Sequence, residues 1–305
     1  MTVAADSTDV AELLKEVRRI EVQSRRLATD VMAGGYVSVF RGAGIEFDEV
    51  REYADGDDPR SVDWNVTARM GRPFVKKFVD ERDLSVLFLL DLSASMTGGF
   101  GIWSARETAA RVCACLGISA TRNGDRVGLV TFGHAVGKYV PAKKGLGHAL
   151  RIVRDTLALP STDGPTDAGP ALEFVARAIR RRAVVFLVSD FLHDGWQRPL
   201  KLCARRHDVV AVRLLAPELT LVDAGLVHVR DPETHAVTVI DTGSARVRDA
   251  FANRVAAWRA RTEADLARAK VDLMDVPVPL APGKDLVAGP ILRFFRMRQL
   301  RGTKR

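Results

Sequence analysis

The chain opens with a helical pattern of apolar and charged positions and then changes to short alternating pieces. Over residues 9–32 apolar side chains recur near helical spacing between charged ones, which predicts an amphipathic helix that Gly34 and Gly35 end. From Tyr36 to Asp83 short alternating pieces are separated by many glycine, aspartate and proline residues. Because these residue types favour turns, we expect a small, compact, non-helical segment there.

The middle of the chain alternates strand and helix patterns, starting with the almost continuous apolar run from Leu84 to Leu92. Such a run is typical of a strand that is covered on both faces. Repeated alternation calls for a mainly parallel sheet with helices on both faces, so the sequence predicts an α/β fold with a doubly wound sheet. The expected elements are strands at 84–92, 126–132, 183–190 and 209–215, an edge strand at 136–140, and helices at 104–122, 147–157, 170–182 and 195–207.

The last part of the chain predicts a hairpin, a long helix and a basic end. Residues 227–229 and 236–240 are separated by the turn-forming sequence DPETH, which indicates a hairpin near the edge of the sheet. A long helix is expected over 244–270, with Ser244 as its cap, followed by a last strand over 271–276. A basic helix over 285–300, interrupted by Gly289 and Pro290, is expected to close the fold.

The composition is that of a folded protein without a membrane span. The 305 residues are 47% hydrophobic, enough for one large α/β domain with an appendage. No stretch approaches the roughly 18 consecutive apolar residues that cross a bilayer. The N-terminus lacks the basic start and the apolar run of a secretory signal. We therefore expect a cytoplasmic protein that does not enter a membrane.

The three cysteines, Cys113, Cys115 and Cys203, cannot form a closed set of disulfides, which fits a reducing compartment. Cys113 and Cys115 lie two residues apart in a helical pattern and point to different faces, so we do not expect them to share a zinc ion. We interpret all three as core thiols.

The net charge of +8 leaves a polyanion-binding surface open as an alternative function. The arginines are spread along the whole chain, and only Arg180–Arg182 forms a run longer than a pair. No basic stretch is interleaved with the aromatic residues that single-strand binders use for stacking. The basic sequence at 291–305 has apolar positions typical of a packed helix with a solvated basic face, so nucleic acid is the less favoured partner.

Three polar clusters fall at strand ends or in neighbouring loops, where a doubly wound sheet binds its ligands. Asp91, Ser93 and Ser95 follow the first apolar strand, Thr166 lies in the polar loop before the helix at 170–182, and Asp190 ends the second strongly apolar strand. A small hard cation prefers about six oxygen ligands and takes only one or two carboxylates. Two aspartates and three hydroxyls meet this demand and leave the ion electrophilic, so that a partner's acidic side chain could bind it.

Asp-x-Ser-x-Ser after an apolar strand, with a downstream threonine loop and a second strand ending in Ser-Asp, resembles the metal-ion-dependent adhesion site of von Willebrand factor A domains. The resemblance implies that Ser93, Ser95 and Thr166 ligate a divalent cation directly and that Asp91 and Asp190 do so directly or through water. It implies Mg²⁺, with Mn²⁺ or Ca²⁺ as alternatives. Phe191 departs from the pattern, because many such domains have glycine there. Asp91 taken alone would be interpreted as a helix cap.

Residues 40–78 resemble the signature of the bacterial domain-of-unknown-function family fifty-eight. Gly-x-Glu-Phe at 44–47, Arg-x-Tyr at 51–53, Gly-Asp-Asp at 56–58, Asp-Trp at 63–64 and Ala-Arg at 68–69 appear in order. Members place this segment before an A-type domain and are associated with MoxR-type AAA+ ATPases. The resemblance implies a binding protein rather than an enzyme, with such an ATPase as partner and an acidic protein as a client of the metal. The expected parts are the N-terminal helix and signature segment (1–83), the A-type domain (84–282) and a C-terminal basic helix with a tail (283–305).

The charged residues of the signature segment allow two interpretations. A folded ion-pair network around Tyr53 and Trp64 is the first, because charged residues mostly pair locally or face solvent. A direct partner surface is the second, and the two are compatible.

Catalytic functions fit the same residues poorly. An aspartyl-phosphate phosphotransferase would need a second acid two residues after Asp91, and Ser93 stands there. A serine hydrolase would have Gly-x-Ser-x-Gly at this turn, and no glycine-rich phosphate loop of the Walker or dinucleotide type is found in the sequence. Two hypotheses therefore remain: a metal-dependent adaptor for an AAA+ ATPase, and a basic surface for polyanions.

Overall fold

The computed structural model describes residues 15–25, 45–54, 57–80, 84–162, 164–283 and 286–302. Its centre is a six-stranded sheet in the order β10-β7-β6-β3-β4-β5, in which every neighbouring pair is parallel except β4 and β5. The chain builds outward from β3 in one direction and then from β6 in the other, so β3 and β6 flank the point where the strand order reverses. The predicted α/β class and the doubly wound, mostly parallel sheet are confirmed. The strands are β3 (Ser85–Asp91), β4 (Arg126–Phe132), β5 (Val136–Lys143), β6 (Val184–Ser189), β7 (Asp208–Leu215) and β10 (Asp272–Pro277).

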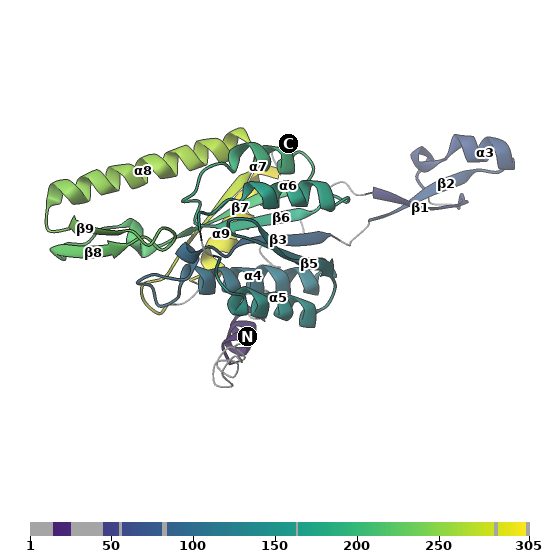
Figure 1. The fold of residues 1–305 in the computed structure, drawn as a ribbon. Helices are drawn as coiled ribbons and strands as arrows, with labels where there is room; N and C mark the ends of the chain where they lie inside the picture. Colours follow the sequence, from purple (N-terminus) through teal and green to yellow (C-terminus); the bar gives the residue numbers. More distant parts are fainter. Residues whose placement is uncertain are drawn as a thin grey trace.

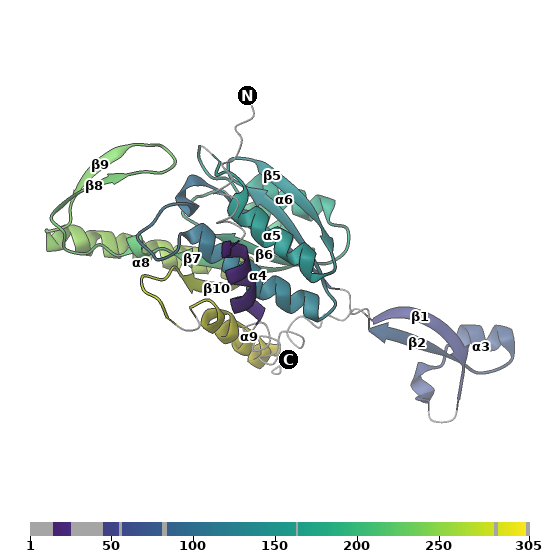
Figure 2. The same ribbon diagram turned by 90° about the horizontal axis from the view of Figure 1, so that it is seen from below.

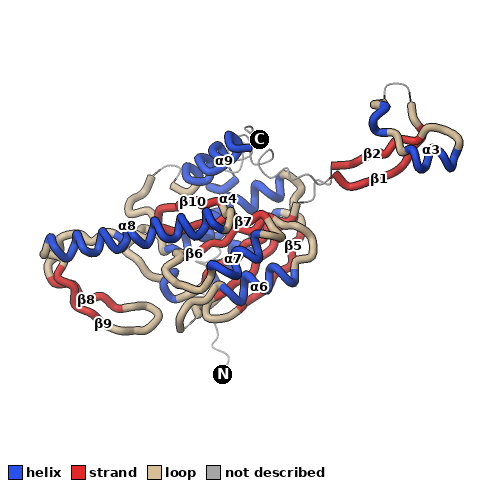
Figure 3. Tube along the Cα trace, turned by 90° about the horizontal axis from the view of Figure 1, so that it is seen from above, coloured by secondary structure: helices blue, strands red, loops and turns tan. Residues whose placement is uncertain are grey.

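Helices cover both faces of this sheet (Figures 1 and 3). Because side chains alternate along a strand, Phe88 and Leu90 of β3 join one core with α4, α5 and α9, whereas Leu87 and Leu89 join the other with α6, α7 and α8. The predicted helices are thus found in the expected two layers. Their bounds are α4 (Ala105–Arg122), α5 (Leu146–Ala158), α6 (Gly169–Ala178), α7 (Gln197–Ala204), α8 (Ala245–Arg268) and α9 (Ala288–Gly302).

The N-terminal helix is present over the described residues 15–25, and the remainder of the predicted range 9–32 lies outside the described residues. Ile20 is fully buried against Ala110, Ala114 and Val153, which belong to α4 and α5. The amphipathic pattern therefore reflects the packing of this helix on the outside of the α4–α5 layer.

The segment before the sheet contains a helix, so the prediction of a non-helical segment was wrong. Strands β1 (Ile45–Glu52) and β2 (Phe74–Asp80) pair antiparallel, and α3 (Trp64–Met70) lies between them in sequence. Asp63 caps α3 by accepting from the amides of Asn65 and Val66, and Gly71 ends it in the left-handed region. The short helix was missed because its turn-rich flanks hide these cap signals. Figure 1 shows this β1–β2–α3 unit apart from the main body, beyond the amino end of β3.

The predicted hairpin exists but not at the edge of the main sheet. Strands β8 (Leu226–Arg230) and β9 (Val237–Asp241) form a separate two-stranded sheet, and the edges of the main sheet are β10 and β5. The hairpin runs alongside α8 at the end of the molecule opposite the β1–β2–α3 unit (Figures 1 and 2). Its strands pair with each other and leave most of their side chains exposed.

The basic C-terminal helix is not interrupted. Gly289 and Pro290 stand in the first turn of α9, where proline lacks only an amide that a helix leaves unpaired. Ile291, Phe294 and Phe295 are buried in the same core as β3 and β10. Among the described helices none is both long and apolar enough to span a membrane.

Candidate metal-binding site

The site is built where β3 and β6 end side by side. Asp91 is the last residue of β3, and Leu90 pairs in parallel register with Val188, so Ser189 and Asp190 arrive at the same level from β6. Ser93 and Ser95 follow in the loop after β3, which forms the short 3-10 turn η2 (Ala94–Met96). The carboxyl ends of these two strands thus meet at the point where the strand order reverses, where open α/β sheets bind ligands.

Hydrogen bonds join four of the five predicted residues. The Ser93 amide donates to Asp91 Oδ1 at 2.9 Å, and the hydroxyls of Ser93 and Ser95 lie 3.0 Å apart. The Ser95 hydroxyl donates to Asp190 Oδ2 at 2.8 Å. Ser189, which lies in the polar cluster with Asp190 but is not among the predicted ligands, also joins the site, since its hydroxyl donates to Asp91 Oδ2 at 2.7 Å. Its signal in the sequence was only its place before Asp190.

Thr166 reaches the same edge of the sheet in a loop that is tied down on both sides. Thr162 forms a parallel bridge with Ser93, and the Asp167 amide donates to the carbonyl of Gly133 at 2.8 Å. The Thr166 hydroxyl does not join the chain of the other four residues and instead binds Glu233. It donates to Glu233 Oε1 at 2.5 Å, and the Thr166 amide donates to Glu233 Oε2 at 3.2 Å. Glu233 was not predicted, because the sequence marks it only as part of a turn.

The electrostatics of the pair Asp91 and Asp190 favour a bound cation. Asp91 is fully buried and Asp190 is 6% exposed. Burial, reinforced by the nearby charge of Asp190, raises the pKa of Asp91 to about 6, although hydrogen bonds from Ser189 and Ser93 oppose the shift. In the described part of the chain, no lysine or arginine forms an ion pair with either carboxylate. Two buried carboxylates without a positive partner fit a divalent ion.

The donor set decides which ion could bind. No group of three or more histidine, cysteine, aspartate or glutamate side chains is gathered for a metal among the residues that the structure describes. An ion bound by Asp91 and Asp190 would therefore complete its shell with hydroxyls and water. That composition suits a hard cation such as Mg²⁺ and not a soft one.

The backbone of Phe191 has the conformation that glycine adopts most easily, which accounts for the glycine that the sequence resemblance implies at this position. Its φ is 59°, in the left-handed region that favours glycine, because the chain turns sharply directly after Asp190. Its ring is 2% exposed and packs edge-on against Trp196 at 5.5 Å. The strained backbone is thus held by side-chain packing, and the same turn lets the Leu192 amide bind Asp190 Oδ1 at 3.0 Å.

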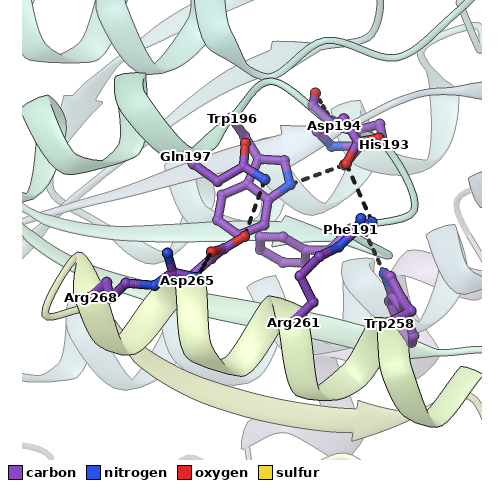
Figure 4. Close-up of polar contacts among 9 residues, drawn as sticks. All are labelled: Phe191, His193, Asp194, Trp196, Gln197, Trp258, Arg261, Asp265 and Arg268. Carbon is purple, nitrogen blue, oxygen red and sulfur yellow. Dashed lines mark hydrogen bonds and ion pairs between the residues drawn. The ribbon is translucent and has the colours of Figure 1, made fainter.

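Helix α8 fixes this turn from outside (Figure 4). Trp258 Nε1 donates to the carbonyl of Phe191 at 3.0 Å, and Gln197 Nε2 donates to Asp265 at 3.2 Å. Trp196 Nε1 donates to the carbonyl of His193 at 3.0 Å, which closes the loop on itself. His193 is half-buried beside the site. The loop that carries Asp190 is therefore a preorganised element.

The family comparison agrees with the resemblance of residues 40–78. The chain matches the family described as "Protein of unknown function DUF58" over residues 49–261. The uncharacterized protein Rv1480 of Mycobacterium tuberculosis is 32% identical over 264 residues, which covers 85% of this chain and 82% of that protein. Among solved structures, the chain is similar to the conserved hypothetical protein BatB from Bacteroides thetaiotaomicron, with 15% identity, coverage of 70% of this chain and 98% of that chain, and a TM-score of 0.43. It is also similar to the SpRpn10 VWA domain, with 15% identity, coverage of 67% and 93%, and a TM-score of 0.39.

Proposed function

Since the chain belongs to the family of proteins of unknown function DUF58, we propose that it is a von Willebrand factor A-type, non-enzymatic, divalent-cation-dependent protein-binding adaptor for a MoxR-type AAA+ ATPase. The observation that supports this proposal is the pair of buried carboxylates, Asp91 and Asp190, which Ser93 and Ser95 link at the switch point of the sheet. Uncompensated charges in this position are costly without a cation.

In this proposal Ser93, Ser95 and Thr166 bind the ion through their hydroxyls, and Asp91 and Asp190 bind it directly or through water. The ion is Mg²⁺, with Mn²⁺ and Ca²⁺ as alternatives, and it supplies an electrophilic position for a carboxylate of an acidic client. The protein holds the ligands in place, because Ser189 and the Ser93 amide fix both oxygens of Asp91 and α8 fixes the turn after Asp190.

The ATPase and the client would bind at different ends of the molecule. The β1–β2–α3 unit precedes the amino end of β3, and Asp91 stands at the carboxyl end of that strand. Trp64 of α3 is 73% exposed, so the expected ion-pair network does not enclose it. Beside Tyr53, Arg51 and Asp57 do form an ion pair. An exposed tryptophan is a frequent anchor of protein interfaces. We assign this unit to the ATPase and the metal site to the client.

The alternative of a polyanion-binding surface receives less support. On α9, Arg298 pairs with Asp208 and Asp272, and Arg301 pairs with Asp272, so part of the basic C-terminal sequence is neutralised within the fold. Beside Thr166 a cavity of ≈ 400 Å³ is lined in part by the acidic residues Asp167, Glu173 and Asp194. Acidic walls repel phosphates. The three free, buried cysteines are consistent with the reducing cytoplasm in which we place the protein.

A pulldown with the full chain tests the proposal. The tagged protein is incubated with native lysate in Mg²⁺ or in EDTA, and isothermal calorimetry measures Mg²⁺ binding in parallel. We expect both the wild type and Asp91→Ala to recover a MoxR-type ATPase through the β1–β2–α3 unit, and we expect Asp91→Ala to abolish Mg²⁺ binding. Asp249→Ala, an exposed acid of α8, is the matched control and should change neither. Salt-sensitive DNA binding that Asp91→Ala leaves intact, without Mg²⁺ binding, would overturn the adaptor in favour of the polyanion surface.

A further inference from the structure

The tip of the β8–β9 hairpin places a carboxylate against one of the proposed metal ligands. Glu233 Oε1 accepts from the Thr166 hydroxyl at 2.5 Å, and Glu233 Oε2 accepts from the Thr166 amide at 3.2 Å. Both carboxylate oxygens are thus engaged with one residue that is 67 positions away in the sequence. A bidentate contact of this kind fixes the direction of the carboxylate as well as its position.

The hairpin is built to present this side chain. Asp231 Oδ1 accepts from the amides of Glu233 and Thr234 at 2.9 and 2.8 Å, so the turn holds Glu233 at the tip. His235 follows with a φ of 59°, which turns the chain back into β9. The turn is therefore ordered by its own bonds and does not need Thr166 to form.

The rest of the hairpin contributes little packing. Val237 and Val239 are 62% and 53% exposed, and the strands pair only with each other. At the base, Thr242 binds the carbonyl of Gly225 and Arg248 binds the carbonyl of Thr242. Among the described residues, the only hydrogen bonds between the hairpin (226–241) and parts of the domain distant from it in the sequence are the two that Thr166 donates to Glu233. Opening the hairpin would therefore disrupt few contacts other than these.

Because Glu233 is negatively charged, a bound cation should strengthen its contact with the site. In the cation-free structure Glu233 meets the site through Thr166 and is not gathered with Asp91 and Asp190 into one group of three carboxylates among the described residues. With a divalent ion between Asp91, Asp190 and Thr166, the same carboxylate is attracted. It then stands where an acidic side chain of a client would be needed, at the Thr166 end of the site.

We propose that Glu233 is an internal ligand that competes with a client's carboxylate for the Thr166 end of the metal site, so that the β8–β9 hairpin must move away before the client binds. This inference rests on the proposed metal-dependent binding function. A tethered carboxylate acts at an effective concentration of the order of millimolar. The apparent affinity for a client is then reduced by the fraction of molecules in which the hairpin is closed.

A peptide added in trans tests the competition on the full chain. The probe is a synthetic peptide with the sequence of residues 226–241, measured by fluorescence polarisation in Mg²⁺ against the wild type, Glu233→Gln and Glu233→Ala. If the hairpin is closed in about nine of ten molecules, removing its carboxylate should tighten binding of the peptide roughly tenfold. A peptide with Gln in place of its Glu should not bind either variant, and Asp249→Asn should behave as the wild type.

The outcomes separate this inference from the function on which it rests. Calorimetry of Mg²⁺ binding to the wild type and to Asp91→Ala is the first arm, and melting temperatures verify that each variant is folded. If Mg²⁺ binds through Asp91 but the peptide binds all forms equally, or binds none of them, the internal ligand is overturned and the metal site stands. If Mg²⁺ does not bind through Asp91, the proposed function is overturned together with the inference.

Discussion

Asp91 is the residue of the candidate site whose negative charge is disfavoured both by burial and by the neighbouring Asp190. Its side chain is fully buried, Asp190 adds a like charge nearby, and its pKa rises to about 6. Hydrogen bonds from Ser93 and Ser189 satisfy both of its oxygens without neutralising its charge. A buried carboxylate that is held in place and has no positive partner fits the proposed cation site.

The raised pKa predicts how stability depends on pH. Because the pKa of Asp91 is about 6 in the folded chain and 3.8 for a free aspartate side chain, the ion-free folded protein binds the extra proton in this window. Through Asp91, stability should therefore fall as the pH rises from about 4 to about 6, and Mg²⁺ should restore it above about 6. Melting temperatures across this range, with and without Mg²⁺, measure the effect.

Asp91→Asn is the control for this dependence, because it keeps the size of the side chain and removes its titration. The difference in melting temperature between wild type and variant should change between about pH 4 and about pH 6, and Mg²⁺ should not stabilise the variant. Parallel pH profiles for the two proteins would contradict the assignment of this titration to Asp91.

Phe191 is the second residue with a specific prediction, because its backbone and its side chain impose opposite preferences. Removal of the buried ring should cost about 3–5 kcal/mol of the free energy of unfolding. Glycine accepts the left-handed backbone and alanine does not, so Phe191→Gly should be more stable than Phe191→Ala by about 1 kcal/mol. In most folded positions the alanine variant is the more stable of the two, so the expected order of stability is reversed here. Urea denaturation of both variants measures it, and an alanine variant as stable as the glycine variant would show that φ is not strained.

At the scale of elements, α9 is part of the main core and not an appended tail. Its apolar side chains pack in one cluster with β3, β7 and β10. The sequence showed the apolar face of this helix but not the surface that it covers, because α9 packs in a core with strands as distant in sequence as β3. Its proline at the first turn sets the start of the helix.

Phe295→Ala should therefore destabilise the whole domain. The ring is fully buried, and its removal should cost about 3–5 kcal/mol of the free energy of unfolding, measured by urea denaturation. Leu300→Ala on the same helix is the matched control, since Leu300 is 68% exposed and its loss should cost less than about 0.5 kcal/mol. Equal, small effects of both substitutions would mean that α9 does not belong to the core.

At the scale of the whole molecule, the sheet separates two surfaces. The β1–β2–α3 unit lies beyond the amino end of β3, and the candidate site lies at its carboxyl end, next to the tip of the β8–β9 hairpin and beside α8 (Figure 1). The proposed adaptor function needs two surfaces that can be occupied together, and these two regions lie apart.

Trp64→Ala tests this separation. Because Trp64 is 73% exposed, its removal should leave the melting temperature within a few degrees of the wild type. We expect it to abolish recovery of the ATPase and to leave Mg²⁺ affinity unchanged, whereas Asp91→Ala should lose Mg²⁺ affinity. Lys143→Ala, on the exposed part of β5, is a control for a surface change elsewhere. Full recovery of the ATPase by Trp64→Ala would remove α3 from the interface.

The sequence by itself determined the order of elements in the α/β body and the residues at its strand ends. Apolar runs such as 84–92 and the helical periods between them are local patterns, so they can be recognised without knowing what they pack against. The same runs located Asp91 and Asp190, because each aspartate stands at the end of an apolar strand. The helix α3 was missed, since its 7 residues between turn signals give too short a period.

Only the tertiary structure decided which side chains meet. Strand order brings Ser189 to Asp91 across 98 positions, and the free-standing hairpin brings Glu233 to Thr166 across 67. Neither contact has a local signature, because it depends on which strands become neighbours and on where a hairpin turns. The backbone at Phe191 is likewise set by packing against Trp196 and α8, which overrides the preference of that turn for glycine.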